Sequence, residues 1–215
     1  MAGKPTVVMI RHGSTELNNQ KGTMRGWLNV PLTSEGHKEA QKVAMEVAQN
    51  FQLKRIFASD LLRVKESAEY LSKATGVPVG YTPNLRPWNG GVLVGKVIPD
   101  LDKQLQYYIE HLNEAPKGGE SMNDFLSRLL GFMAKVFDHV EMGESPVACY
   151  TSVRPIEATL GWVEGGMTGK IDPTRLEAKK ETVKPGGFTT IVKGPKEWKE
   201  EIFAPNHGPG GGAEE

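Results

Sequence analysis

The feature that most constrains this chain is an apolar run that stops abruptly at charged residues. Residues 7–10, Val-Val-Met-Ile, are typical of a short strand buried on both faces of a sheet. Arg11, His12 and Gly13 follow at once, and the glycine permits a tight turn. Ligands of open α/β sheets bind beyond the carboxyl ends of the strands. The sequence therefore predicts that Arg11 and His12 meet a ligand at this edge.

Composition limits the classes of partner and the cellular compartment that are expected for this chain. The 215 residues suit one domain with a sizeable core. The 26 Lys and Arg residues balance 26 Asp and Glu residues, so no net charge draws the chain to nucleic acid or to an anionic membrane. Cys149 is the only cysteine, which excludes an intramolecular disulfide framework and fits a reducing compartment. No hydrophobic signal region or membrane-length run is evident, and we expect a cytoplasmic protein without nucleic-acid or membrane partners.

Apolar periodicity predicts strands that alternate with helices. Thr33 or Ser34 can cap a helix whose apolar stripe runs over residues 40–51. A strand at 55–58 follows, and Ser59-Asp60 are predicted to cap a helix with Arg63 in its first turn. The other expected segments are strands at 77–79, 146–150 and 188–192, helices at 98–112 and from Glu120-Ser121 to Val140, and a connection at 165–187.

Several motifs occur in a recognisable order. They are Arg11-His12-Gly13-Ser14-Thr15 with Asn18, Arg25-Gly26-Trp27, Pro31 to Gly36, Ser59 to Arg63, and Gly118 to Ser121. Together they resemble the histidine phosphatase superfamily, the phosphoglycerate-mutase-like proteins, over about residues 5–165. The resemblance implies an α/β fold, a three-layer α/β/α sandwich with a mostly parallel sheet. We expect this domain over residues 1–203 and a flexible Gly-rich tail over 204–215, where His207 is a bystander.

The retained residues suit a phosphate pocket. The His12 imidazole, with an ordinary pKa of about 6.5, can attack a phosphoryl centre when one nitrogen is unprotonated. Arg11 and Arg63 can clamp phosphoryl oxygens, and Arg63 matches the second phosphate-binding arginine of the family. Gly13 and Asn18 are predicted to add neutral donors. The sequence has no metal-ligand cluster, so neither a metal nor a cofactor is expected.

Two positions depart from the family pattern. Pro87 stands where the resemblance implies a general acid, and no carboxylate occurs between Thr82 and Ile98. Ser152 stands where the family has a second catalytic histidine. The serine keeps a hydrogen-bond donor but lacks the charge of the histidine, and the loss of that charge-assisted bond costs roughly 1.5 to 3 kcal/mol. A missing acid costs a further factor of about 10² to 10⁴. A substrate with a good leaving group suffers less from the second loss.

Other candidates carry alternatives. Arg86 and Arg154 are candidates for accessory anion contacts, although a surface position is the better interpretation for Arg86. Glu120 is either a replacement acid and substrate contact or, with Ser121, part of a helix cap. His37, His111 and His139 lie on polar segments and are expected to be exposed.

Three functions remain open. The first is phosphomonoester hydrolysis through a phosphohistidine on His12, with Ser152 as a weak substitute donor. The second is a degenerate protein that binds a phosphorylated small molecule or phosphoprotein without turnover. A mutase is the least favoured, because mutases also need the acid and the second histidine. Phosphohistidine trapping on His12 separates the first from the second.

Overall fold

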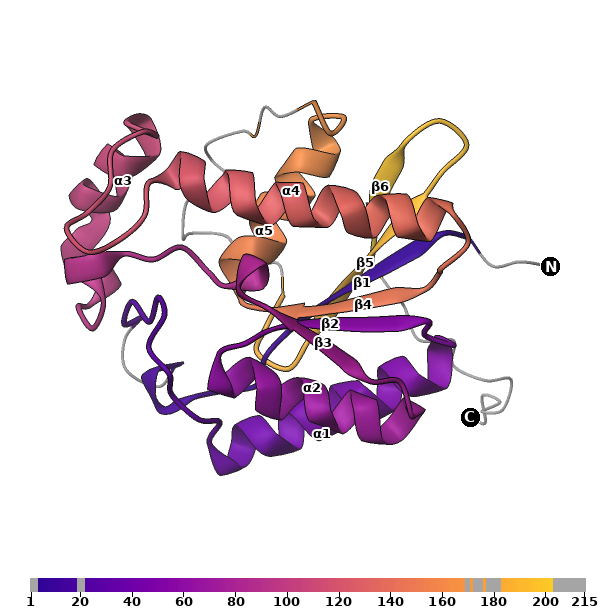
Figure 1. The fold of residues 1–215 in the computed structure, drawn as a ribbon. Coiled ribbons are helices and arrows are strands. Elements are labelled where there is room, and N and C mark those ends of the chain that lie inside the picture. Colours follow the sequence, from indigo (N-terminus) through magenta and orange to yellow (C-terminus); the bar gives the residue numbers. More distant parts are fainter. Residues whose placement is uncertain (1–3, 19–21, 169–170, 172–175, 177–182, 203–215) are drawn as a thin grey trace, which may run out of the picture.

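The computed structural model describes residues 4–18, 22–168, 171, 176 and 183–202. A six-stranded sheet with the strand order β3-β2-β4-β1-β5-β6 organises these residues (Figure 1). Strands β3, β2, β4 and β1 run parallel to one another, whereas β5 and β6 are antiparallel to their neighbours. The expectation of a mostly parallel sheet is confirmed.

The first strand and the first helix match the sequence patterns. Strand β1 (Thr6–Arg11) is buried along its whole length. Helix α1 (Ser34–Asn50) is capped by Thr33, whose hydroxyl accepts a hydrogen bond from the N–H of Gly36 at 3.0 Å. The apolar stripe of α1 packs on the sheet, as its spacing predicts.

The next unit differs from the prediction at the helix cap and in the bounds of its last strand, which was expected at 77–79. Strand β2 (Arg55–Ser59), helix α2 (Leu62–Thr75) and strand β3 (Val79–Thr82) follow in the expected order. Ser59 and Asp60 were expected to cap α2, but Leu61 holds the N-cap position without a side-chain bond. The carboxylate of Asp60 instead binds Arg86. The guanidinium of Arg86, which lies in a distant loop, therefore binds the carboxylate that the local sequence pattern predicted as the cap of α2.

The second half holds three further helices. A 3₁₀ turn (Ile98–Leu101) leads into α3 (Asp102–Glu110), so the helix expected over 98–112 is shorter than its pattern. Helix α4 (Met122–Glu141) is capped by the Ser121 hydroxyl. Strand β4 (Val147–Thr151), helix α5 (Val153–Glu164) and strand β5 (Phe188–Lys193) follow. A further strand, β6 (Trp198–Glu201), pairs with β5, whereas the sequence predicted no strand after 188–192.

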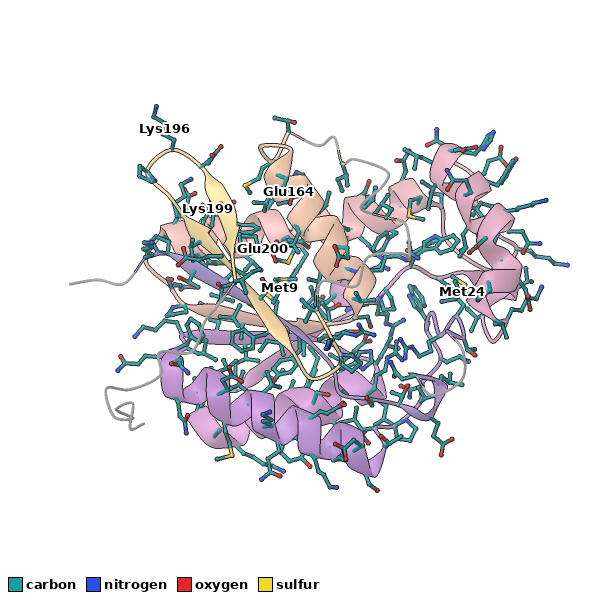
Figure 2. The ribbon with its side chains drawn as sticks, turned by 180° about the vertical axis from the view of Figure 1, so that it is seen from behind. Met9, Met24, Glu164, Lys196, Lys199 and Glu200 are labelled. Atoms are coloured by element: carbon teal, nitrogen blue, oxygen red, sulfur yellow. The ribbon has the colours of Figure 1, made fainter. Side chains whose placement is uncertain are left out.

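The helices cover both faces of the sheet. Helices α1 and α2 lie on one face, and α4 and α5 lie on the other (Figure 1). Val8 and Ile10 belong to the apolar cluster under α1 and α2, whereas Val7 and Met9 belong to the cluster under α4 and α5. Figure 2 shows Met9 in the interior and Lys196 at the tip of the β5–β6 hairpin. The three-layer α/β/α sandwich is confirmed.

Some predictions fall outside the described residues. These are the tail at 204–215 with His207 and most of the connection between residues 169 and 182. Among the described residues, no helix is both long and apolar enough to cross a membrane.

Candidate active site

Parallel strands end at one edge of the sheet, and polar residues follow each end. Arg11 ends β1, Ser59 ends β2 and Thr151 ends β4. The N–H of His12 donates to the carbonyl oxygen of Thr151 at 3.0 Å, so the residues after β1 lie against those after β4. The candidate site therefore forms at the edge where the sequence predicted it.

His12 is fully buried and its tautomer follows from its contacts. Nδ1 lies 2.7 Å from the carbonyl oxygen of Gly13, and because a carbonyl only accepts, Nδ1 carries the proton. Nε2 is then unprotonated and accepts a hydrogen bond from Nε of Arg63 at 3.2 Å. Burial, together with the charges of Arg63 and Arg25, holds the pKa of His12 well below its usual 6.5. At pH 7 this residue is a neutral imidazole with its lone pair on Nε2.

Two glycines let the loop after β1 pack directly on the start of α1. A Cβ atom at Gly13 would lie 2.1 Å from the carbonyl oxygen of Gly36, and one at Gly36 would lie 2.0 Å from that of Ser14. The N–H of Gly13 donates to the Ser67 hydroxyl at 3.1 Å. In this structure Gly13 orients His12 through its carbonyl, and its contact with a substrate stays a prediction.

Arg63 lies in the first turn of α2 and is almost fully buried. Its terminal nitrogens donate to the carbonyl oxygens of Leu28 at 2.7 Å and Gly26 at 3.1 Å, in addition to the bond from Nε to His12. Within the described part of the chain, these bonds use three of its five N–H groups. Burial and the charge of Arg25 lower the pKa of Arg63 to about 9, which leaves it charged at neutral pH. Two N–H groups remain for an anion.

Arg25 is a charged site residue that the sequence reasoning quoted but did not assign. Its Nη1 donates to the Thr15 hydroxyl oxygen at 3.4 Å, and its charge acts on both His12 and Arg63. Its only signal was the Arg-Gly-Trp motif that it begins. Asn18, a predicted substrate donor, accepts the N–H and hydroxyl of Thr15 at 2.9 Å through its side-chain oxygen, so in this structure it stabilises the same loop.

Residues 183–187 contact the residues that end β1. Nη1 of Arg11 donates to the carbonyl oxygen of Val183 at 2.7 Å, and its backbone N–H donates to that of Gly187 at 2.9 Å. The N–H of Gly186 donates to the carbonyl oxygen of His12 at 3.1 Å. Arg11 is buried and held beside His12 by this segment, where its guanidinium adds positive charge.

Ser152 lies at the N-terminus of α5 and is only 6% exposed. It occupies the N-cap position without making a cap hydrogen bond, and its hydroxyl has no partner among the described residues. A buried hydroxyl without a partner costs free energy, and an anion at this helix end would satisfy it. Arg154 is half-buried and donates to the carbonyl oxygen of Leu176, while burial lowers its pKa to about 10. Arg154 is thus engaged by the chain, and its anion contact stays a prediction.

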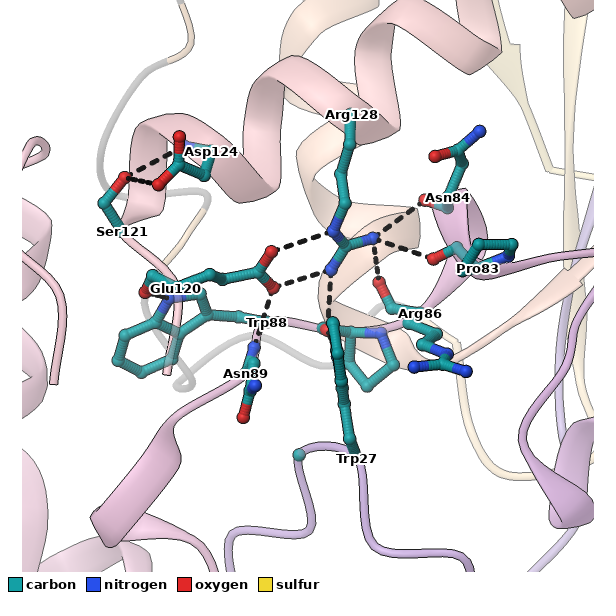
Figure 3. Close-up of polar contacts among 12 residues, drawn as sticks. Trp27, Pro83, Asn84, Arg86, Trp88, Asn89, Glu120, Ser121, Asp124 and Arg128 are labelled. Carbon is teal, nitrogen blue, oxygen red and sulfur yellow. Dashed lines mark hydrogen bonds and ion pairs between the residues drawn. The ribbon is translucent and has the colours of Figure 1, made fainter. Parts of the chain in front are cut away.

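The loop at residues 83–89 lies beside this edge and is fixed from three elements. The Thr151 hydroxyl donates to the carbonyl oxygen of Leu85 at 2.6 Å, and the Trp27 indole donates to that of Pro87 at 2.8 Å. Arg128 of α4 donates to four carbonyl oxygens of the loop (Figure 3), those of Pro83, Asn84, Arg86 and Pro87. The backbone of the loop is therefore held at several points.

Glu120 is bound rather than free. Its carboxylate accepts two hydrogen bonds from Arg128, at 2.9 and 2.7 Å, and one from the N–H of Asn89 at 2.8 Å (Figure 3). The side chains of Arg128 and Glu120 are 18% and 14% exposed. Ser121 alone caps α4, so the expectation that Glu120 shares the cap is wrong. Both oxygens of this carboxylate are therefore occupied as hydrogen-bond acceptors.

Arg86 is not a free surface arginine, and that interpretation is wrong. Its guanidinium donates to both oxygens of Asp60, at 2.6 and 2.5 Å, and lies 4.6 Å from the ring centroid of Trp27. The hydrogen bonds and charge of Arg86 hold the pKa of Asp60 below its usual range. The pair links the loop at 83–89 to the end of β2.

His37, His111 and His139 contact residues outside the candidate site. His37 contacts Tyr70, His111 stacks on Tyr107, and His139 lies 3.2 Å from Glu144. His111 is exposed, as expected, whereas His37 and His139 are half-buried. Among the residues whose placement is described, no group of three or more His, Cys, Asp or Glu could hold a metal ion.

The arrangement can support chemistry on a phosphoryl group. A neutral imidazole offers a lone pair at Nε2, and Arg11, Arg25 and Arg63 place positive charge around it. Guanidinium groups bind phosphoryl oxygens and neutralise charge that builds on them during transfer. In the ligand-free structure Nε of Arg63 occupies the lone pair of His12, so a phosphoryl group would have to replace that contact.

Comparison with known proteins gives a consistent result. A profile of the histidine phosphatase superfamily (branch 1) matches residues 7–181. "Probable phosphoglycerate mutase GpmB" of Salmonella choleraesuis is 29% identical over 146 residues, and the match covers 66% of each chain, slightly less than two thirds of that relative. The chain belongs to the histidine phosphatase superfamily (branch 1).

Solved structures with this fold include named phosphatases. A mycobacterial glucosyl-3-phosphoglycerate phosphatase complexed with VO3 aligns with a TM-score of 0.73 and 24% identity, over 94% of this chain and 98% of that one. The alpha-ribazole phosphatase of Shigella flexneri aligns with a TM-score of 0.74 and 18% identity, over 92% and 95%. At these identities the likeness supports the fold alone, and the activity has to be argued from the site.

Proposed function

We propose that this protein hydrolyses phosphate monoesters through a phosphohistidine on His12. The observation that carries the proposal is the state of the imidazole, which is neutral and protonated on Nδ1, with its Nε2 lone pair beside Arg63. Histidine in this form is a competent nucleophile. Arg11, Arg25 and Arg63 neutralise the phosphoryl oxygens, and the unpartnered hydroxyl of Ser152 donates to one of them.

The ligand of the site is a phosphorylated small molecule or a phosphoprotein. In the first step Nε2 attacks phosphorus and the bond to the leaving oxygen breaks. In the second step water attacks the phosphohistidine, the P–N bond breaks, and inorganic phosphate leaves a neutral His12. The arginines and the helix N-terminus at Ser152 supply the charge stabilisation that both steps need.

A second candidate function is binding without turnover. It is favoured by Ser152, which carries no charge where the family pattern has a histidine, and by the hydrogen bond from Arg63 to the attacking nitrogen. In this case Arg11 and Arg63 hold a phosphorylated ligand that is never cleaved.

Acid-labile labelling and steady-state hydrolysis separate the two functions. The wild-type protein, His12→Asn and the matched control His111→Asn are mixed with p-nitrophenyl phosphate, and the quenched protein is mapped by mass spectrometry. His111 is an exposed histidine that stacks on Tyr107, far from the site in its contacts. We expect a phosphorylated peptide containing His12 in the wild type and in the control, and loss of label and turnover in His12→Asn. Phosphate binding with neither label nor turnover would establish the second function instead.

A further inference from the structure

The loop at residues 83–89 borders the phosphate centre and carries no acid. Thr151 contacts both regions, since its carbonyl accepts from His12 and its hydroxyl donates to Leu85. Trp27 provides a second connection between the loop and the phosphate centre. Its indole donates to the carbonyl oxygen of Pro87, and the carbonyl oxygens of the residues before and after it accept hydrogen bonds from Arg63. The residues at 86–89 are Arg, Pro, Trp and Asn, none of which donates a proton usefully at neutral pH. We refer to this loop as the leaving-group loop.

The carboxylates that contact the leaving-group loop are all engaged. Both oxygens of Asp60 accept hydrogen bonds from Arg86, and both oxygens of Glu120 accept hydrogen bonds from Arg128. The hydrogen bonds and charge of Arg86 hold the pKa of Asp60 below its usual range, and both oxygens of Glu120 are occupied as hydrogen-bond acceptors. Within the described part of the chain, the side of the site formed by this loop therefore offers acceptors and cations instead of a proton donor.

We propose, on the basis of the function above, that the substrates are phosphoryl donors whose leaving oxygen is already acidic, namely acyl phosphates and aryl phosphates. The conjugate acid of a carboxylate leaving group has a pKa of about 4, and that of a phenolate has a pKa of about 10. An alkoxide, whose conjugate acid is much weaker, needs a proton to leave. A site with a strong phosphate clamp, and with no proton donor among the described residues of its leaving-group side, selects the first two groups by rate.

The reaction balances without an added proton. Nε2 of His12 forms a bond to phosphorus, the P–O bond breaks, and its electron pair leaves with the carboxylate or phenolate. Water then attacks phosphorus, the P–N bond breaks, and its electron pair returns to Nε2. The two protons of water leave on dihydrogen phosphate. Nδ1 keeps its proton throughout and donates it in a hydrogen bond to the carbonyl oxygen of Gly13.

The test is a leaving-group series on the intact wild-type protein. Values of kcat/KM are measured at pH 7 for acetyl phosphate, for aryl phosphates of graded phenol pKa and for glycerol phosphate. We expect kcat/KM to fall steadily as the leaving-group pKa rises and the alkyl ester to be roughly 10²- to 10⁴-fold slower than the fastest aryl ester. A flat series, in which glycerol phosphate matches the aryl esters, would overturn the inference.

Two variants at one position sharpen the result. Pro87 is buried in the leaving-group loop and has no N–H to lose, and its carbonyl contacts stay available to any residue. Pro87→Glu adds an acid and should accelerate the slowest esters most, whereas Pro87→Gln adds only a neutral amide and should leave the slope unchanged. Equal effects of Glu and Gln would contradict the assignment, and the wild-type series decides it if either variant fails to fold.

Failure of this inference differs from failure of the proposed function. If the phosphohistidine on His12 forms from every ester at similar rates, the nucleophile is confirmed and the selectivity is refuted. If no ester labels His12 and none is hydrolysed, both proposals fall together.

Discussion

The two sides of the site are built in different ways. The side proposed to receive the phosphoryl group consists of His12, Arg11 and Arg63, all buried at the end of a strand or the start of a helix. The leaving-group loop begins with a single 3₁₀ turn (Pro83–Leu85) and is held by Arg128 through its backbone carbonyls. On the first side Arg63 donates to a neutral nucleophile and to two backbone carbonyls, whereas on the second side Asp60 and Glu120 are each matched with an arginine.

The difference teaches where evidence of function lies in this molecule. An uncompensated buried charge costs free energy and persists where a ligand supplies the opposite charge. A matched ion pair is explained by the fold itself. On this comparison Arg63 serves activity and Arg128 serves stability, and substitutions of the two arginines should separate these roles.

The largest effect should follow from Arg63→Gln. The substitution keeps a donor for one loop carbonyl but removes the charge that faces a phosphoryl group. We expect kcat/KM for p-nitrophenyl phosphate to fall about 10³-fold, in line with the loss of one charged donor in a transition state. Arg55→Gln is the matched control, since Arg55 pairs with Glu144 at the exposed opposite end of β2 and should leave activity unchanged. A loss below ten-fold for Arg63→Gln would contradict its role as a clamp.

Arg128→Gln should act on stability instead. The change leaves Glu120 with one donor, the Asn89 N–H, and removes the guanidinium that binds four loop carbonyls. Breaking a mostly buried ion pair costs about 3 kcal/mol of unfolding free energy, measurable by urea denaturation. Arg55→Gln again provides the comparison, because its exposed pair should leave the urea midpoint close to that of the wild type. An unchanged midpoint for Arg128→Gln would remove the structural account of the loop.

The parts of the fold that follow local rules were predictable from the sequence. The buried run at 7–10, the hydroxyl cap at Thr33 and the stripe of α4 each depend on residues close together in the chain. The Asp60 cap failed because Arg86, 26 residues away, binds that carboxylate. Strand β6 was missed because Trp198-Lys-Glu-Glu is a polar edge strand whose pairing with β5 no local pattern reveals.

The site was predictable to a smaller extent. Strand ends and motif order were enough to select His12, Arg11 and Arg63, which the structure brings together. Arg25 was not assigned, because its effect is electrostatic and depends on a loop that folds back over α2. Arg128 is positioned by the carbonyl oxygens of a loop 41 to 45 residues away, and in that position it binds Glu120. The sequence therefore could not show whether the Glu120 carboxylate is free or bound.

Ser152→His tests the donor on the phosphoryl side and should produce a smaller, opposite effect. A charged donor at the N-terminus of α5 would replace a hydroxyl that has no partner in the described structure. We expect kcat/KM to rise by about ten-fold or more, the difference between a neutral and a charged hydrogen bond. Ser152→Asn is the control, since it adds a larger neutral donor. An equal gain in both variants would show that size, not charge, limits the site.

The smallest effect should be a pH dependence of stability. The pKa of His12 is held well below 6.5 in the folded protein, chiefly by burial, whereas the unfolded residue titrates near 6.5. As the pH falls below 6.5, unfolding takes up a proton, so this contribution to stability is complete above 6.5 and is lost towards the folded pKa, by at most about 1.4 kcal/mol per pH unit.

The measurement is the unfolding free energy of the wild type and His12→Asn in urea between pH 7.5 and 5.5. This range lies above the ordinary titration of the carboxylates, which act alike in both proteins. The wild type should lose stability more steeply than the variant across the lower part of the range, because only the wild type has to protonate a buried imidazole on unfolding. Parallel curves would mean that His12 has the same pKa in the folded and the unfolded protein, which would contradict the buried neutral imidazole on which the proposed nucleophile rests.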